Sequence, residues 1–318
     1  MNSSMAVLVC SLAIYYGTPM FIAALGCVLN ERSGVLNLGV EGMMLLGAVG
    51  ASFVSARFDA PAAVVLLAAV MFSMLLGAGG ALIHAFAVIT LRVNQTVSGL
   101  ALTILAGASG LSSYLADVWD LRDPVPHQFG RLDVFGLKDL PIAGPILFNQ
   151  TLLTYGSWLL CAGASFYLFR TRFGLHLRAV GESPQTADAM GISVVRYRYV
   201  HTLIGGALAG LAGSCFSLSI LPNWSDGLTN GQGWIAIALV IFGFWRPGLT
   251  LAGAYLFGAI ASLGGILQAR GVDVAASALD VLPYLTTIVV LTIVSSGWSK
   301  RRVGAPAALG IPFDREAR

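Results

Sequence analysis

The chain has 318 residues, of which 57% are hydrophobic and 10% are charged, and its formal net charge is +3. This composition excludes a soluble globular domain and predicts an all-α polytopic membrane protein. The Lys and Arg residues follow the boundaries of the apolar runs and form no patch suited to nucleic acid, which excludes a nucleic-acid partner.

Nine apolar runs divide the chain, which we interpret as one transmembrane domain over residues 1–318. About 20 apolar residues are needed for a helix to cross the hydrocarbon core of a bilayer. The seventh run is short, and it or the second run can consist of two pieces, so we expect about nine helices, within eight to ten. The predicted spans are 6–29, 34–56, 62–90, 95–115, 149–169, 199–220, 233–245, 248–268 and 279–297.

The second run opens with a polar interruption that places an acidic residue at membrane depth. Residues 1–30 carry no Asp, Glu, Lys or Arg, and no charge follows Glu41 until Arg57. Because ionisable side chains within a membrane are costly, Glu41 is a candidate site residue. The neighbouring Asn37 and two glycines favour a broken helix, which is tolerated at this depth where the backbone faces protein or a water-filled cavity.

The segment 116–148 separates the fourth and fifth spans and is rich in Asp and Pro. Its four prolines limit long helices. We expect an ordered external cap, and a solvated loop with no role is the alternative.

Orientation follows from the distribution of Lys and Arg, which concentrate in cytoplasmic connections. With nine spans and the segment 170–198 inside, thirteen of the 18 Lys and Arg residues lie in the cytoplasm and five lie outside. The sequence therefore predicts an external N-terminus, a cytoplasmic loop at 170–198, and a cytoplasmic tail at 298–318.

A short helix is predicted within the loop 170–198. Ser183 can cap it with its hydroxyl group, Pro184 suits the first helical position, and Gly191 can take the left-handed conformation that ends it. Such a helix suits docking into a groove of a cytoplasmic partner, and a capped linker is the alternative. Its apolar surface consists of Ala187, Met190 and Ile192.

The stretch from Gly174 to Ile192 reads GLxLRAVGESPxxAxxMGI and is followed by GGALAGLAG at 205–213. This pattern resembles the coupling region of bacterial ABC importer permeases for simple sugars, nucleosides and branched-chain amino acids. Within that family, ERSGVLNLGVEG at 31–42 is most similar to the nucleoside and simple-sugar branch, including guanosine and purine permeases. The blocks VNQTVSGLAL at 93–102 and GQGWIAIALVIFG at 231–243 agree, and the resemblance covers about residues 6–297.

The resemblance implies a permease fold with broken helices around a central pathway, in the bacterial inner membrane. It also implies three kinds of partner: a second permease subunit that completes a heterodimer, two ATP-binding subunits or one fused ATPase, and an extracytoplasmic substrate-binding protein. The short helix would then be the coupling helix that sits on the ATPase. The residues that would form this contact are Gly181, Glu182, Ser183, Pro184, Ala187, Met190 and Gly191.

This chain has no ATP site of its own. A phosphate-binding loop needs Gly-Lys-Ser/Thr, whereas Lys138 follows a leucine and Lys300 follows a serine. The four cysteines lie singly in apolar runs, without the spacing of a metal or redox motif. We therefore expect no catalytic residue, metal or cofactor in this chain, with ATP and Mg²⁺ bound by the partner.

Polar residues within the apolar runs are candidates for a solute pathway, where they can hydrogen-bond a ribose or a base. Equally, they can join helices, since interhelical polar contacts stabilise membrane proteins by about 0.6 kcal/mol on average. Glu41 can instead pair with an Arg or cap a helix break, and Trp234 can be a core or interface anchor. The candidates are Asn37, Glu41, Asn94, Gln95, Ser98, Asn230, Gln232 and Trp234.

Two further patterns concern an internal repeat and helix packing. The sequence Asn230-Gly231-Gln232-Gly233 is weakly similar to residues 37–42, as in transporter folds built from two related halves. Gly206, Gly210 and Gly213 have the spacing of small residues that allows close helix contact, and His84 is expected to be a packing residue.

The leading function is the permease subunit of an ABC importer for nucleosides or a related ribose-like solute, with simple sugars or branched-chain amino acids as alternatives. An ion-coupled secondary transporter would need paired buried charges, and Glu41 is the one acidic residue in the interior of a predicted span, since Asp280 lies at the very start of the last one. An intramembrane enzyme would need a nucleophile with a base or paired metal ligands, and the sequence has no such spacing.

Overall fold

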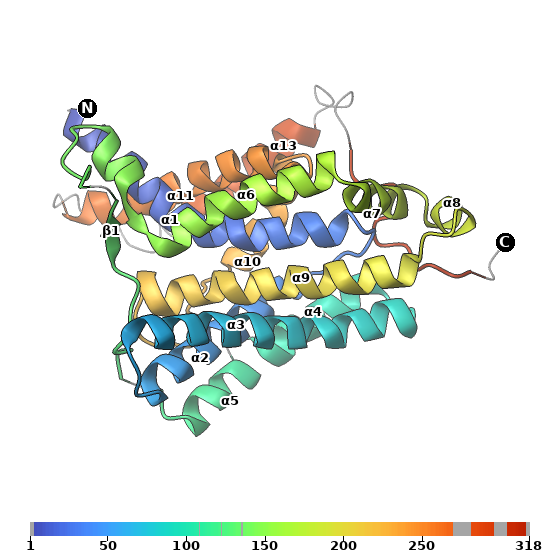
Figure 1. Cartoon of the computed structure of the whole chain (residues 1–318), viewed down its shortest axis with the longest axis horizontal. Helices are drawn as coiled ribbons and strands as arrows, with labels where there is room; N and C mark the ends of the chain where they lie inside the picture. The colour runs from blue at the N-terminus through green and yellow to red at the C-terminus, as the bar shows by residue number, and fades with distance from the viewer. Residues whose placement is uncertain are drawn as a thin grey trace.

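The computed structural model describes residues 3–107, 109–121, 123–134, 136–269, 281–295 and 304–315. It is a bundle of helices whose long members run in roughly the same direction (Figure 1). One end of the bundle carries α7 (Arg172–Glu182) and α8 (Pro184–Ala189), and we call it the α8 end. The long helices are α1 (Ser3–Glu31), α3 (Ala62–Ala85), α6 (Leu152–Arg170), α9 (Val194–Cys215) and α11 (Pro247–Ala269).

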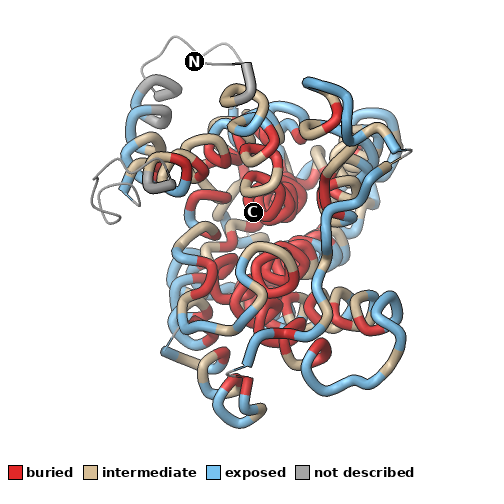
Figure 2. Tube along the Cα trace, turned by 90° about the vertical axis from the view of Figure 1, so that its left-hand side faces the viewer, coloured by how far each residue is buried: buried red, intermediate tan, exposed pale blue. Residues whose placement is uncertain are grey.

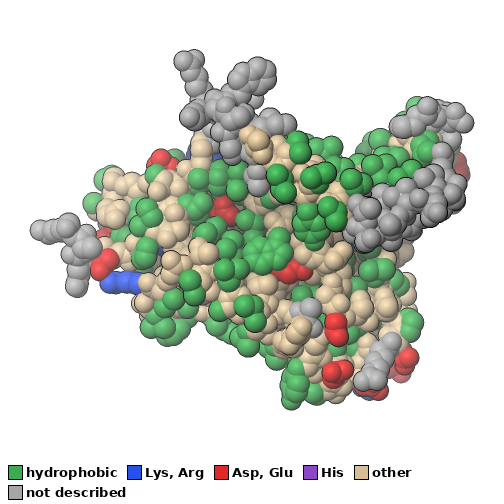
Figure 3. All heavy atoms as spheres, turned by 180° about the vertical axis from the view of Figure 1, so that it is seen from behind, with side chains coloured by type: hydrophobic (Ala, Val, Ile, Leu, Met, Phe, Trp, Pro, Cys, Tyr) green, Lys and Arg blue, Asp and Glu red, His purple; other side chains and the backbone are tan. Residues whose placement is uncertain are grey.

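Six helices of the described residues are long and apolar enough to cross a membrane. Leucine and isoleucine side chains on their outer faces are exposed, such as Ile104 at 78% and Leu159 at 75%, as expected for surfaces that meet lipid. Figure 3 shows hydrophobic side chains spread across the middle of one face. These six spans are Met5–Glu31, Ala62–Thr90, Gln95–Val118, Leu152–Arg170, Val194–Ile220 and Pro247–Leu267.

The predicted multi-pass membrane protein is therefore confirmed, while the count of about nine spans stays a prediction. The seventh predicted span is the short apolar helix α10 (Gln232–Phe242), as its length suggested. The ninth corresponds to α13 (Leu282–Ser295), and the remaining residues of 279–297 lie outside the described part of the chain.

The second and fourth predicted spans are interrupted. Residues 32–39 form no helix, and α2 runs from Val40 to Arg57, so the predicted break around Asn37 is confirmed. The predicted span over 95–115 corresponds to the candidate span Gln95–Val118, which is interrupted, because α4 (Gln95–Ala106) ends before Gly107 and α5 (Leu111–Val118) starts after it. The carbonyl of Gly107 instead accepts a hydrogen bond from the Ser112 hydroxyl group at 2.7 Å.

The buried residues gather in the interior of the bundle, as the view along its axis shows (Figure 2). The core includes α1, α2 and α9, and α3 packs against α9 at backbone distance. A Cβ on Gly210 would lie 2.1 Å from the Ser73 carbonyl oxygen, and one on Gly206 would lie 2.3 Å from the Ala81 Cβ. Only glycine fits at these two positions, which confirms the predicted close helix contact.

The segment 170–198 connects two of the candidate spans and is more helical than its one predicted short helix, because it also contains α7 and the start of α9. Thr171 caps α7 by accepting a hydrogen bond from the Gly174 backbone N–H at 3.0 Å. Leu177 and Val180 follow Gly174 at helical spacing and are buried. After α8, α9 begins at Val194, five residues before the predicted start of that span at 199.

The segment 116–148 is ordered and carries no α-helix beyond the end of α5 in its described residues. It contains β1 (Arg131–Asp133) and the π-helical turn η2 (Gly144–Phe148), and β1 pairs antiparallel with β2 (Asn149–Thr151). It is held against the π-helical turn η3 (Phe216–Ile220), which continues α9, because the Phe129 N–H donates to the Leu218 carbonyl at 2.8 Å. A similar turn, η1 (Phe86–Thr90), ends α3.

Candidate functional site

The interruption at 32–39 lies within the protein, and side chains of neighbouring helices bind its backbone. The Gln95 side-chain oxygen accepts a hydrogen bond from the Leu36 N–H at 2.6 Å, and His84 Nε2 lies 3.1 Å from the Leu36 carbonyl oxygen. The Thr103 hydroxyl group donates to the Leu38 carbonyl at 2.9 Å. Non-helical backbone at membrane depth needs such partners because lipid supplies none.

Two more predicted pathway residues belong to this network. The Asn37 side-chain oxygen accepts a hydrogen bond from the Gly39 N–H at 2.8 Å. The Ser98 hydroxyl group lies 3.0 Å from His84 Nδ1 and so helps to orient the imidazole. Their contacts are those of residues that hold the break in place, which is the alternative to contact with a solute.

Glu41 joins the first break to the start of α10. Its carboxylate accepts hydrogen bonds from the Thr229 hydroxyl group at 2.5 Å, from the Gly231 N–H at 2.9 Å and from the Gly233 N–H at 2.6 Å. The side chain is only 7% exposed. A carboxylate at a helix N-terminus satisfies N–H groups that have no partner within the helix and complements the helix dipole.

These bonds bring together the two segments whose sequences echo one another. Gly231 has a φ of +74°, a left-handed conformation that glycine adopts without strain, and it directly precedes α10. Glu41 therefore has the contacts of a residue that caps a helix break.

A cavity of about 260 Å³ lies beside the α10 start, between α1, η3, α11 and α13. Gln232 lines it, and the side-chain oxygen of Gln232 is buried without a hydrogen-bond partner. Asn230 also lines it, in a left-handed conformation with a φ of +44°. The rings of Tyr16, Phe216 and Tyr284 contribute to its wall. This cavity can offer a small molecule an amide acceptor and aromatic surface.

The structure thus separates the predicted pathway residues. Asn230 and Gln232 share one cavity, whereas Trp234 is 37% exposed and does not line it. Asn94 caps α4 by accepting a hydrogen bond from the Val97 N–H at 3.1 Å. The sequence interpretation missed Tyr16 and Phe216, because an aromatic residue in an apolar run carries no signal of its own.

The predicted short helix exists as α8. It begins at Pro184 and is followed by Gly191, whose φ of +81° is the predicted left-handed conformation. The predicted cap is wrong in its chemistry, because the Ser183 hydroxyl group lies 2.7 Å from the Thr186 hydroxyl group and makes no bond to a backbone N–H.

The predicted apolar docking surface is also corrected. Ala187 is only 3% exposed, because it packs against Val180 and Val194 within the chain, while Met190 is 78% exposed. The outward side chains around α8 are those of Gln185, Thr186, Ala189 and Met190.

Residues 304–315 form a strap across the α8 end, which the prediction of a cytoplasmic tail did not anticipate. The Ala308 N–H donates to the Gly181 carbonyl at 2.9 Å, and the Gly310 N–H donates to the Gly34 carbonyl at 3.2 Å. The Ile311 carbonyl accepts a hydrogen bond from Arg198 at 3.1 Å. The strap therefore connects α7, the break at 32–39, and α9.

Two ion pairs extend this strap. Arg92 contacts Asp314 at 2.6 Å, and Arg315 contacts Asp188 of α8 at 2.9 Å. Glu182, at the end of α7, is exposed.

Basic groups surround the end of α1. The Arg32 guanidinium is buried and donates to the Trp245 carbonyl at 3.1 Å. Burial and the neighbouring guanidinium groups of Arg178 and Arg246 lower the pKa of Arg32, and Glu182 opposes this shift. Within the described residues, no group of three His, Cys, Asp or Glu side chains is placed to hold a metal ion.

Comparison with known proteins gives a family match over residues 10–291, to the permease component of branched-chain amino acid transport systems. The chain is 38% identical to the guanosine ABC transporter permease NupQ of Bacillus subtilis, over 96% of each chain. It is 37% identical to TsgC13 of Haloferax volcanii, provisionally named a glucose ABC transporter permease, over 94% of this chain and 95% of that protein.

It is also 36% identical to the nucleoside ABC transporter permease NupC of Lactococcus lactis, over 88% of this chain and 90% of that protein. A second guanosine permease of Bacillus subtilis, NupP, is 26% identical over 88% of this chain and 79% of its own length. This chain is thus similar, to different degrees, to two permeases of one organism.

Proposed function

The chain belongs to the family of permease components of branched-chain amino acid transport systems. Within this family, we propose that it carries a nucleoside across the bacterial inner membrane. It is a multi-pass, non-catalytic permease component of an ABC transporter, as its relatives are. The nucleoside is the proposed part, and the cavity beside α10 is the observation that carries it.

The lining of this cavity favours a neutral solute with hydrogen-bonding edges. The amide groups of Asn230 and Gln232 can bind a base edge or a ribose hydroxyl group, and the Tyr16 and Phe216 rings can stack on a base. No charged side chain lines the cavity among the described residues. An amino acid would bring two charges into it without counter-charges, which is costly, so the cavity disfavours branched-chain amino acids as the solute.

A simple sugar is the second candidate, and the similarity to TsgC13 favours it. A hexose is also neutral and hydrogen-bonding, and aromatic rings can pack against its apolar face. The nucleoside remains the first proposal, because NupQ and NupC are both named for nucleosides.

We propose that about nine spans surround the pathway, with the breaks at 32–39 and before α10 facing each other near its centre. Glu41 supports this arrangement, because it follows the break at 32–39 and its carboxylate accepts hydrogen bonds from the backbone at the start of α10. Broken helices at the midplane are how many transporter folds build their solute sites.

We also propose that α8 couples this chain to an ATPase. The exposed residues Gln185, Ala189 and Met190 of α8 and its C-terminal cap lie at one end of the bundle, and the sequence contains no phosphate-binding loop. The α8 end then faces the cytoplasm, together with the strap and the C-terminus, as the thirteen-to-five distribution of basic residues supports.

The partners follow from this assignment. An ABC importer permease works with two ATP-binding subunits or one fused ATPase, and with an extracytoplasmic binding protein. The similarity to both NupQ and NupP supports a second, different permease as the other half of a heterodimer.

Uptake assays test the solute. Cells that express this permease with its partner subunits should accumulate labelled guanosine, and unlabelled nucleosides should compete better than glucose or leucine. Omission of the ATPase should abolish uptake. Uptake that glucose abolishes and nucleosides do not would replace the nucleoside with a hexose.

Paired substitutions test the coupling surface. Met190→Glu changes an exposed residue, so we expect normal folding with weaker binding to the ATPase and slower uptake. Ala187→Glu places a charge in the packed contact with Val180 and Val194, so we expect a destabilised chain, by several kcal/mol if the charge stays unpaired. Thermal unfolding and co-purification with the ATPase separate the two effects. Normal assembly and uptake with Met190→Glu would show that this surface does not contact the ATPase.

A further inference from the structure

An apolar groove runs along α6. It consists of three cavities that share lining residues, and we call it the α6 groove. The cavity nearest the α8 end has a volume of about 630 Å³ and shares Tyr167 and His201 with the next, of about 670 Å³. That cavity in turn shares Leu159 and Leu160 with a third, of about 620 Å³, which lies towards the opposite end.

The middle of the groove is lined by aliphatic side chains and by glycine. Leu25 and Leu29 of α1 and Leu208 of α9 line it opposite α6. Gly163 of α6 also lines it, and a Cβ built on this residue would meet no atom within 4 Å. Since the groove lies along membrane-spanning helices and is this apolar, hydrocarbon is the chemistry that fits it.

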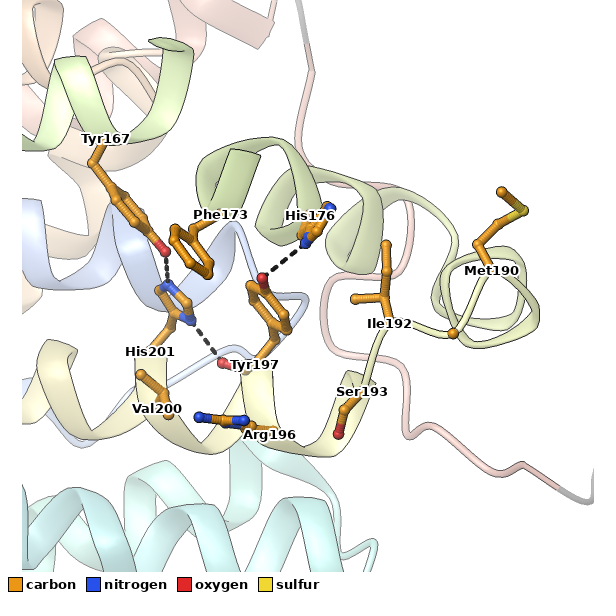
Figure 4. Close-up of a pocket in the computed structure, with 11 residues that line it drawn as sticks. Tyr167, Phe173, His176, Met190, Ile192, Ser193, Arg196, Tyr197, Val200 and His201 are labelled. Atoms are coloured by element: carbon orange, nitrogen blue, oxygen red, sulfur yellow. Dashed lines mark hydrogen bonds between the residues drawn. The ribbon is translucent and has the colours of Figure 1, made fainter. Parts of the chain in front are cut away.

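The chemistry changes at the α8 end of the groove. Figure 4 shows the side chains of Tyr167, His176, Arg196, Tyr197 and His201 around this cavity. The Tyr167 hydroxyl group lies 2.8 Å from His201 Nε2, and the Tyr197 hydroxyl group lies 3.0 Å from His176 Nδ1. Tyrosines are typical of the level at which a span meets the lipid headgroups.

Two groups at this end remain available to a ligand. Among the described residues, no hydrogen bond or ion pair engages the Arg196 guanidinium, and no acidic side chain lines the cavity. His176 uses only Nδ1. When Nδ1 accepts the Tyr197 hydroxyl hydrogen, Nε2 carries a hydrogen that it can donate to an anionic oxygen.

We propose that the α6 groove binds an anionic phospholipid of the leaflet at the α8 end. Its phosphate lies against Arg196 and His176, and one acyl chain follows α6 past Gly163 towards Leu159. Charge complementarity selects the headgroup and the length of the apolar groove selects a lipid chain, so neither a free anion nor a neutral lipid satisfies both ends. Basic residues near a membrane surface are known to attract anionic lipids.

Native mass spectrometry of the detergent-purified transporter tests this proposal, with phosphatidylglycerol, phosphatidylcholine or inorganic phosphate added. We expect preferential retention of phosphatidylglycerol. Arg196→Gln should weaken its binding about five-fold, the effect of one basic residue at a membrane surface. Arg246→Gln is the matched control, because Arg246 is exposed near the same end but does not line the groove.

A second variant tests the acyl chain. Gly163→Leu fills the middle of the groove without a clash at Cβ, so it should reduce lipid retention in a stably folded chain. Gly248→Leu is its control, because Gly248 of α11 also has no neighbour within 4 Å and lies outside the groove.

Three results would overturn the proposal. Equal retention of phosphatidylglycerol and phosphatidylcholine would remove the headgroup site. Displacement of the lipid by millimolar inorganic phosphate, with Gly163→Leu unchanged, would leave a free-anion site. Retention of the lipid by the permease alone, with no lipid retained when the ATPase is bound, would assign this cavity to the ATPase instead.

Discussion

The helix break at 32–39 and the break before α10 differ in how their polar groups are hydrogen-bonded. At 32–39, the Leu36 N–H and carbonyl are bound by Gln95 and His84, so side chains from α3 and α4 complete the backbone bonding. At the start of α10, Glu41 binds the backbone, yet the side-chain oxygen of Gln232 is left without a partner beside a cavity. Gln95 thus holds the backbone with its side-chain oxygen, while its side-chain nitrogen is buried without a partner and lines no part of this cavity. The unpaired oxygen of Gln232 differs because it lies beside a cavity, where a ligand can reach it.

The free-energy cost of an unpaired buried polar group explains why the two sets of residues should respond differently to substitution. A buried polar group without a partner costs about 1–3 kcal/mol, so an unpaired acceptor at a cavity is kept only where water or a ligand can bind it. The same reasoning makes the bound groups structural. The comparison predicts that substitutions at the bound groups lower stability, while substitutions at Gln232 lower transport.

The largest effect is expected at Glu41. Glu41→Ala leaves the buried N–H group of Gly233 and the half-buried N–H group of Gly231 without an acceptor. At about 1–3 kcal/mol for a fully buried group, this should destabilise the chain by about 2–4 kcal/mol. Thermal unfolding in detergent measures this change. Thr229→Val is the control, since it removes one donor and leaves no backbone group unpaired, and should cost about 1 kcal/mol. A stable Glu41→Ala variant that only loses uptake would make Glu41 a solute-binding residue.

A smaller loss of stability is expected at Gln95. Gln95→Leu removes the acceptor of the Leu36 N–H and should destabilise the chain by about 0.6–2 kcal/mol, the range for polar contacts between membrane helices. The KM for uptake should not change in the fraction that folds. A raised KM with unchanged stability would show that Gln95 contacts the solute and is not a structural residue.

Gln232 should behave in the opposite way. Gln232→Leu leaves no bonded partner unsatisfied, so stability should stay within about 0.5 kcal/mol of the unchanged chain. Loss of one hydrogen bond to the solute should raise the KM for uptake about 2–10-fold. Gln232→Asn, which keeps a neutral amide acceptor, should transport better than Gln232→Leu. If Gln232→Leu destabilised the chain as much as Gln95→Leu does, Gln232 would be a structural residue like Gln95.

The smallest effect is expected at the edge of the strap. Arg315→Ala removes an ion pair whose arginine side chain is 78% exposed, and such pairs contribute about 0–1 kcal/mol. The free energy of unfolding of the Arg315→Ala variant should be nearly equal to that of the unchanged chain at both low and high salt. A loss above 2 kcal/mol would show that this pair is part of a tighter network.

The sequence predicts the parts of this fold that depend on local chemistry. The break at 32–39 follows from Asn37 and adjacent glycines, the short α10 follows from the length of its apolar run, and α8 follows from Pro184 and Gly191. The family resemblance supplied the transport function, which apolar composition alone could not.

The features that the sequence does not predict depend on tertiary contacts. Nothing in the composition around Ala308 indicates that its N–H binds Gly181, more than 100 residues earlier. Ala187 looks like a surface residue of a short amphipathic helix until Val180 and Val194 cover it. Asn94, Gln95 and Gln232 are alike as sequence signals, and only their neighbours separate a cap, a brace and an open acceptor.

The strap also orders the biogenesis of the protein. Residues 304–315 follow every described span in the chain, so the ribosome makes them after those spans. Their bonds to Gly34, Gly181 and Arg198 can form only then. The α8 end therefore cannot take its final form before the tail is made, and a chain cut before residue 304 by a nonsense codon or a protease lacks this closing layer.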